Sequence, residues 1–361
     1  MSLVGFSESA LRAILGTLGV VFFGIVFGLL YKGLDRKISA HMQGRIGPPI
    51  VQPFRDVRKL LTKENIVPEN AVPWIFNLVP LIGLVATISI LLYLPILPVE
   101  GFSPILATEG DLILILYLLL IPSLAMVIGG FSSGSPYAIV GAQREMATMI
   151  AYEFPLAIII ISIATRLIET GDQPVFALST IATTPVFNVV GIVGFIGLII
   201  LLLILILVTP AELSKIPFDA PEAETEIAGG LLAEYSGRNL AMFYLTDAVK
   251  TFVMASLIVV LFFPYNLSPL IGLENMYAIV LIDGIFFLLK VFLVAFFSVT
   301  LIRVAIARLR IDQIVYTYWV PLTLLALIGL ICIMWDQVAT NYLMEKFGWE
   351  STFFEQLSNL F

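Results

Sequence analysis

The chain is poor in the side chains that bind metals or form cross-links. Its 361 residues include one cysteine and one histidine, and only 12% of them are charged. Cys332 lies alone within an apolar run, which excludes a disulfide framework and a thiolate metal site built by this chain alone. His41 is the single histidine, so the chain lacks the ligand set of a haem or zinc site. We interpret His41 as a surface residue of a basic loop. We therefore expect no metal and no cofactor bound by this chain.

Apolar residues dominate the composition instead. They make up 60% of the chain, whereas soluble domains carry about 45–50% apolar and roughly 25% charged residues. Several runs reach the roughly 20 residues that a helix needs to cross a bilayer core. Glu8 and Arg12 precede the first run without a small-residue cleavage signal, so we interpret it as a retained span and not as a signal peptide. The composition predicts an all-α polytopic membrane protein.

Charges, prolines and glycines divide the apolar sequence into eight predicted spans within a single membrane domain, 1–361. The spans are expected at 10–34, 74–96, 112–130, 148–166, 185–208, 241–263, 278–302 and 316–335. Fourteen of the 19 Lys and Arg residues then fall on one side of the membrane, and only Arg12, Arg166 and Lys346 fall on the other. By the positive-inside rule, the long loops face the cytoplasm and both termini face outside.

Two long loops lie on the basic side. In the loop 35–73, the segment 51–64 has apolar residues at helical spacing, which predicts an amphipathic helix on the membrane surface. The loop 209–240, here called the acidic loop, has only Lys215 and Arg238 as basic residues. Its six acids are Glu212, Asp219, Glu222, Glu224, Glu226 and Glu234.

The acidic loop has two readings. It is either a solvated acidic loop or a segment packed into the protein, and interleaved apolar residues such as Ile216, Phe218 and Ile227 favour packing. In that case Glu222 and Glu226, at i and i+4, would lie close together in a low dielectric. Desolvation and like charge would then raise the pKa of at least one carboxyl group.

The predicted spans also contain charged residues, and an unpaired charge at mid-membrane costs at least a few kcal/mol. Asp247 and Lys250 are three residues apart on one helical face and are expected to pair directly. Asp283 and Lys290 are two turns apart and need a bridging group. These charges, together with Glu145 and Glu153 near the start of the fourth span, are either structural ion pairs or a chain that carries protons or ions. Three spans with polar interiors favour the second reading.

Four stretches resemble the membrane subunit that joins the hydrophilic and membrane arms of respiratory complex I, the NuoH family. They are DRKISAHMQGRIGPP at 35–49 followed by KLLTKE at 59–64, YAIVGAQREMATMIAYE at 137–153, ELSKIPFDAPEAETEIAGGLLAEYSG at 212–237, and ARLRIDQ at 307–313. The matches occur in order through nearly the whole chain, and the family also has eight spans. The resemblance implies a cofactor-free helical subunit that lies under an iron–sulfur-bearing peripheral arm and beside antiporter-like membrane subunits.

The resemblance also implies roles for individual residues. Those that would line the start of a lateral ion path are Glu153, Glu212, Glu222, Glu226 and Glu234. To this set we add the loop acids Asp219 and Glu224 and the span residues Asp247, Lys250, Asp283 and Lys290. A second set of residues is expected to dock the peripheral arm, because side chains such as arginine can pair with carboxylates of a partner. The set consists of Arg36, Gln43, Arg45, Arg144, Glu145, Lys215, Arg308 and Arg310. The alternative for the basic ones is an ordinary positive-inside anchor.

One segment points to a branch of this family. Quinone-reducing members usually have small or neutral residues after the arginine of the second motif, whereas this chain has Gln143, Arg144, Glu145 and Met146. The segment looks more like that of membrane-bound [NiFe]-hydrogenases and related sulfur-reducing complexes. That likeness implies ferredoxin as electron donor, a large hydrogenase-like partner subunit, and iron–sulfur clusters, with or without a nickel–iron centre, in the partners. The bulky segment should fill the wall of any quinone tunnel.

Two alternatives remain open. The first is the quinone-binding subunit of an NADH or F420H2 dehydrogenase. The second is a secondary transporter, which would usually show two repeated halves with broken helices at mid-membrane. No internal repeat is evident, and the acidic loop lies at one membrane face. Neither reading includes a nucleic-acid partner.

Overall fold

The computed structural model describes residues 3–95, 106, 111–170, 176–271, 275–336, 338 and 342. Among them, eight helical segments are long and apolar enough to cross a membrane, so the predicted all-α polytopic fold with eight spans is confirmed. The first five are α1 (Leu3–Met42), α3 (Pro73–Tyr93), α4 (Leu112–Ser132), α5 (Pro136–Thr170) and α8 (Ile192–Glu212). The sixth is α10 (Gly237–Phe262). The last two are composite, α12 (Met276–Ala295) with η3 (Phe296–Thr300) and α13 (Leu301–Ala305), and α14 (Ile311–Thr317) with η4 (Tyr318–Leu322) and α15 (Thr323–Met334).

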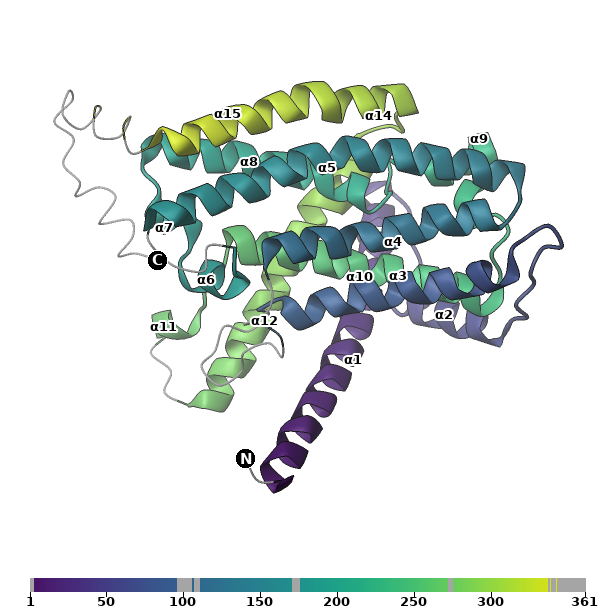
Figure 1. Ribbon diagram of the computed structural model, residues 1–361, viewed down its shortest axis with the longest axis horizontal. Helices are drawn as coiled ribbons and strands as arrows, with labels where there is room; N and C mark the ends of the chain where they lie inside the picture. The colour runs from purple at the N-terminus through teal and green to yellow at the C-terminus, as the bar shows by residue number, and fades with distance from the viewer. Residues whose placement is uncertain are drawn as a thin grey trace.

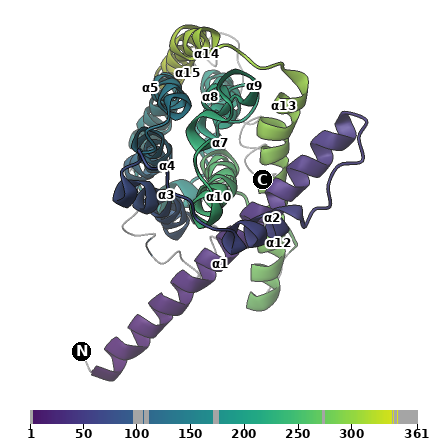
Figure 2. The ribbon, with the colours of Figure 1, turned by 90° about the vertical axis from the view of Figure 1, so that its right-hand side faces the viewer.

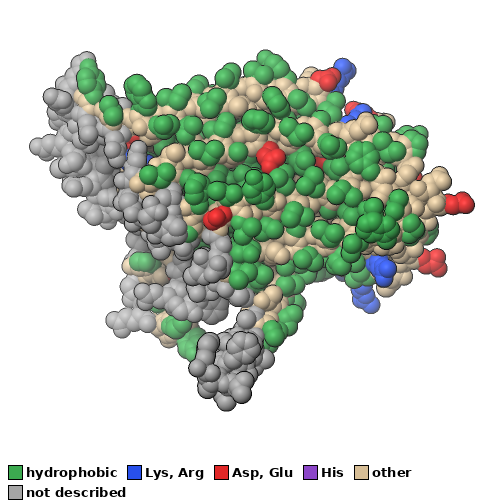
Figure 3. All heavy atoms as spheres, in the orientation of Figure 1, with side chains coloured by type: hydrophobic (Ala, Val, Ile, Leu, Met, Phe, Trp, Pro, Cys, Tyr) green, Lys and Arg blue, Asp and Glu red, His purple; other side chains and the backbone are tan. Residues whose placement is uncertain are grey.

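The helices form one bundle with two oblique members. Figure 1 shows α3, α4, α5, α8, α10 and α15 with roughly parallel axes, while α1 and α12 cross them. Figure 2 shows α1 as a long diagonal whose N-terminal part extends away from the other helices. The face seen in Figure 3 is largely hydrophobic, and most of its charged side chains gather at the end where α2 and α9 lie.

Helix α10 is the centre of the bundle. In its most apolar window 89% of the residues are buried, against 22–56% in the other spans. Gly28 of α1 allows a close approach to α10, because a Cβ atom there would lie 2.7 Å from the backbone oxygen of Ala248. Any charged side chain on this part of α10 must therefore find its partners inside the protein.

The predicted surface helix is α2 (Gln52–Thr62). Pro53 lies in its first turn, where the missing N–H costs nothing, and the helix ends at Thr62, before Lys63, whose backbone is extended. Its apolar face, with Phe54 and Val57, packs against α1 and α10. Helix α2 thus packs at the same end of the bundle as the acidic loop (Figure 1).

The acidic loop contains three short helical turns between α8 and α10. They are η1 (Ala220–Glu222), α9 (Glu224–Ile227) and η2 (Gly230–Leu232). Its apolar side chains Phe218, Ile227 and Leu231 are buried, so the packed reading of this loop is confirmed and the solvated reading is wrong. The remaining short helices are α6 (Leu178–Thr183), α7 (Val186–Val189) and α11 (Ser268–Ile271).

A buried ion pair fixes the end of the bundle opposite the acidic loop. Arg166 of α5 lies 3.4 Å from Asp336, which follows α15, and both side chains are buried. The Asp336 carboxylate also accepts hydrogen bonds from the backbone N–H groups of Gly191 and Gly194, at 2.7 and 2.6 Å. These are free N–H groups in the first turn of α8, so the carboxylate caps that helix. Lys346, which was expected on this side, lies outside the described residues.

Candidate functional site

The first charge cluster surrounds Lys250 in the middle of α10. Its Nζ lies 2.8 Å from Oε1 of Glu212, and the two side chains are 3% and 2% exposed. The same Nζ donates to the backbone oxygen of Glu212 and to the hydroxyl of Ser123, each at 2.8 Å. Tyr152 of α5 hydrogen-bonds to the Glu212 side chain and lies 3.3 Å from the Ser123 hydroxyl. We call Lys250, Glu212, Glu145, Ser123 and Tyr152 the Lys250 cluster.

The second charge cluster surrounds Asp247, one turn earlier on α10. Its two carboxylate oxygens lie 2.6 Å from Nζ of Lys32 and 2.6 Å from Nζ of Lys215. The Lys32 ammonium also lies 3.3 Å from the centre of the Tyr244 ring, a cation–π contact. We call Asp247, Lys32, Lys215 and Tyr244 the Asp247 cluster.

The predicted direct pair between Asp247 and Lys250 is therefore wrong. The spacing allows such a pair, but α10 is surrounded on all sides by other elements. Asp247 meets cations from α1 and the acidic loop, and Lys250 meets the end of α8. Three tertiary ion pairs replace the one expected within the helix.

Two consecutive residues of the acidic loop contact both clusters. Ser214 forms a hydrogen bond of 3.3 Å with Oε2 of Glu145, and Lys215 holds Asp247. Ser214 has φ of 48°, a left-handed conformation that non-glycine residues rarely adopt. This turn directs the two neighbouring side chains to different clusters. A movement of the loop at this point therefore acts on both clusters together.

Glu145 was expected to dock a partner, and that prediction is wrong. Its side chain is only 1% exposed, because α5 begins at Pro136, twelve residues before the predicted span. Lys215 was also placed at the docking surface, but its charge is used within the chain by Asp247. Both residues belong to the interior charge network.

Two arginines hold the outer part of the acidic loop. Arg308, between α13 and α14, binds both carboxylate oxygens of Asp219 and donates to the Thr225 hydroxyl at 3.0 Å. Arg144 of α5 pairs with Glu226 and donates to the backbone oxygen of Ala220 at 3.3 Å. Arg144 is therefore tied to the acidic loop of the same chain.

Glu222 and Glu226 do not form the predicted pair. They lie on different short helices, η1 and α9, and Glu226 is taken by Arg144. Burial nevertheless raises the pKa of Glu222 to about 6, while the nearby Lys215 ammonium opposes that rise. Desolvation thus gives the acidic loop a carboxyl group that titrates close to neutrality.

The remaining predicted acids are distributed more widely. Glu224 is exposed, while Glu234 and Glu153 are half-buried. Asp283 accepts hydrogen bonds from the backbone N–H groups of Leu267 and Ser268, at 3.0 and 2.9 Å. Lys290 donates to the backbone oxygens of Phe263 and Tyr265, at 2.8 and 2.7 Å. Asp283 and Lys290 thus hold the connection after α10, which matches the structural reading of these two charges.

The docking residues of the first loop are only partly available. Arg36 pairs with Asp56 of α2 at 3.0 Å, whereas Gln43, Arg45 and Arg310 are exposed. Sequence reasoning missed Asp35, which pairs with Arg303 at 2.9 Å. It also missed the role of Lys32. The signal was the spacing of Asp35 and Arg36 at three and four residues after Lys32, which indicates that the helix continues past the predicted end at residue 34, and it does so to Met42.

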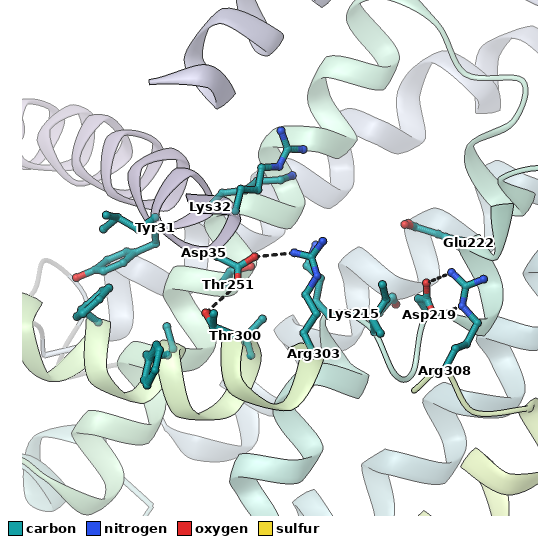
Figure 4. A pocket seen from close by; sticks show the side chains of 18 of the residues that line it. Tyr31, Lys32, Asp35, Lys215, Asp219, Glu222, Thr251, Thr300, Arg303 and Arg308 are labelled. Carbon is teal, nitrogen blue, oxygen red and sulfur yellow. Dashed lines mark hydrogen bonds and ion pairs between the residues drawn. The ribbon is translucent and has the colours of Figure 1, made fainter. Parts of the chain in front are cut away.

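A cavity of about 390 Å³ lies between α1, the acidic loop and the α12–α13 segment. Figure 4 shows Asp35 pointing toward Thr300 and Arg303 on one side, and Asp219 toward Arg308 on the other. The apolar residues that line the cavity include Tyr31, Phe292 and Phe296. The charged residues that line it are Lys32, Asp35, Arg36, Lys215, Asp219, Glu222, Glu224, Arg303 and Arg308. The cavity therefore joins the Asp247 cluster to the acidic loop.

The comparisons with known proteins agree with one another. A family model described as NADH dehydrogenase matches residues 15–334. A NADH-quinone oxidoreductase subunit of Brevibacillus brevis is 33% identical over 322 residues, covering 86% of this chain and 90% of the relative. An F(420)H(2) dehydrogenase subunit of Methanosarcina mazei is 30% identical over 330 residues, covering 87% of this chain and 91% of the relative.

A solved structure is similar in both fold and sequence. It belongs to the membrane-bound sulfane sulfur reductase, an archaeal respiratory membrane complex. The TM-score is 0.76 at 29% sequence identity, and the match covers 89% of this chain and 99% of the other.

A double-mutant cycle tests the partner of Lys250. Lys250→Met alone should destabilise the protein by about 3–5 kcal/mol, because the Glu212 carboxylate stays buried without its cation. Adding Glu212→Gln should recover part of the loss, with a coupling energy of about 0.5–3 kcal/mol. Unfolding of the detergent-solubilised protein measures the effect, and Asp247→Asn is the matched control. Coupling of Lys250 to Asp247 and not to Glu212 would contradict the structure.

The raised pKa of Glu222 predicts a pH dependence. The unfolded chain releases this proton near pH 4.5 and the folded protein near pH 6. The folded state thus binds more protons between these values, so stability should fall as the pH rises through that window. Glu222→Gln should remove this fall, and Glu224→Gln, at an exposed neighbour, should retain it. Equal pH profiles of unfolding temperature for the wild type and Glu222→Gln would refute the assignment.

Proposed function

The chain belongs to the NADH dehydrogenase family, as a NuoH-like subunit of complex I-like membrane complexes, and from that premise we propose that its charge clusters couple electron transfer in a peripheral arm to ion movement across the membrane. The chain itself performs no redox step in this proposal. Its task is to convert a change at the acidic loop into a change of charge inside the spans.

The observation that carries the proposal is the contact of Ser214 and Lys215 with both clusters. Lys215 neutralises Asp247, and its charge also acts on Glu222. When Glu222 loses its proton, a second anion competes with Asp247 for Lys215. Such competition gives the network two arrangements with similar energies, which is the kind of element through which distant sites are coupled.

We infer that the complex belongs to the hydrogenase-like and sulfur-reducing branch and is linked to ferredoxin. The packing of Arg144 against the acidic loop supports this, because it leaves a bulky, charged wall where an isoprenoid tail would need an apolar one. The many charged residues around the cavity support it too, since ligand pockets for apolar molecules are lined mainly by apolar side chains.

The partners proposed for this chain follow from the branch. They are peripheral iron–sulfur subunits, a large hydrogenase-like subunit and antiporter-like membrane subunits. The exposed Gln43, Arg45 and Arg310 are the docking residues that remain available at the end of the bundle with the acidic loop. We place that end at the cytoplasmic face of the inner membrane. The ions moved are protons or Na⁺.

A second candidate is the quinone-binding subunit, favoured by the cavity of about 390 Å³ and its aromatic residues Tyr31, Phe292 and Phe296. Stoichiometric quinone in the purified complex would support this candidate. Family membership sets aside the secondary transporter.

The coupling proposal predicts the effect of Lys215→Gln. Loss of this cation should lower the number of ions moved per electron several-fold, while ferredoxin-driven turnover stays within about twofold. The complex is purified, reconstituted in liposomes and assayed for both quantities. Lys63→Gln, an exposed lysine after α2, is the control and should match the wild type. An unchanged ratio in Lys215→Gln, with an assembled complex, would refute the proposal.

A further inference from the structure

Lys250 makes its close contacts with groups other than Glu145. An ammonium group has three N–H donors. The Lys250 Nζ has three contacts at 2.8 Å, with Oε1 of Glu212, the backbone oxygen of Glu212 and the hydroxyl of Ser123. The close contacts of the cation are therefore with Glu212 and Ser123, although Lys250 is also the positive charge that acts on Glu145.

Glu145 is poorly paired for a buried carboxylate. It is 1% exposed, Oε2 has a single long hydrogen bond of 3.3 Å to Ser214, and Oε1 has no hydrogen-bond partner among the described residues. An ionised carboxylate that is buried this deeply needs a cation or several donors. The site offers one hydroxyl group.

The other charges around Glu145 add to this cost. Glu212 faces it from the end of α8 and Glu222 from the acidic loop, against the single cation Lys250 of α10. Tyr152, which is on α5 like Glu145, lies near Glu145 as well. Two ionised carboxylates, Glu145 and Glu212, would leave a net negative charge in a buried region. Of the two, Glu212 has the direct ion pair with Lys250.

We propose that Glu145 is a proton-binding site that holds its proton in the resting complex. In the neutral form its carboxyl O–H donates to the Ser214 hydroxyl, and only a carbonyl oxygen stays unpaired. That costs far less than an unpaired charge. The contact with Ser214 makes the site sensitive to the position of the acidic loop. Its use as a proton store in ion movement rests on the function proposed above, but its protonation does not.

Infrared spectroscopy of the purified resting complex at neutral pH tests the proposal. A protonated carboxylic acid has a C=O stretching band that is distinct from carboxylate bands and shifts in D₂O. The difference between wild type and Glu145→Gln should contain one such band, and Glu69→Gln, an exposed carboxylate of the α2–α3 connection, should show none. Absence of the band in the Glu145→Gln difference would overturn the assignment.

A second variant keeps the test decisive if Glu145→Gln does not assemble. Ser214→Ala removes the hydroxyl that the neutral carboxyl group contacts, so the band should persist and move to a different frequency. An unmoved spectrum in Ser214→Ala would count against the site. Both spectra are taken without turnover, so a failure of the coupling proposal, detected by the Lys215→Gln assay, leaves their outcome unchanged.

Discussion

The buried ion pair of Lys250 and Glu212 constrains the rest of the functional end of the molecule. Lys250 lies on the most buried helix, so its charge is stable only if all of its N–H groups find oxygen acceptors inside the protein. Glu212 and Ser123 supply three oxygen atoms at 2.8 Å from Nζ. Helices α4, α8 and α10 are thereby fixed around one cation, and the start of the acidic loop is fixed with them because Glu212 ends α8.

The position of the acidic loop follows from this anchor. Two residues after Glu212 the chain turns through the left-handed Ser214, and Lys215 then reaches Asp247. The loop is held farther out by Arg144 and Arg308. Glu222 lies half-buried between these fixed points on the wall of the cavity, and desolvation raises its pKa to about 6. A loop held at both ends, with a titratable group between them, suits a coupling role.

The sequence predicted the number and the order of the spans, because apolar runs of sufficient length have few alternatives to a membrane helix. It also predicted the amphipathic helix α2 and favoured a packed acidic loop, in both cases from apolar residues among polar ones. Boundaries were less certain. Helices α1 and α5 extend past the apolar runs, to Met42 and from Pro136, because polar residues continue a helix where neighbouring elements pack against it.

The partners of the buried charges could not be predicted in the same way. Asp247 and Lys250 have a spacing that suits a direct pair, but pairing inside a bundle depends on which helices pack together. Lys32 is 215 residues from Asp247 in sequence, and no local pattern announces that contact. Glu145 was assigned to the surface because its segment looked like a loop end, whereas the longer α5 buries it.

Structures of the intact complex in two redox states test the central claim, that the acidic loop transmits a redox event to the charged spans. Cryo-electron microscopy of the oxidised complex and of the complex reduced by ferredoxin gives both from one preparation. The account predicts that the turn of Ser214 and Lys215 moves between the states, with Lys215 leaving Asp247 while Lys250 stays on Glu212. Identical positions of Ser214, Lys215 and their partners in both states would contradict it.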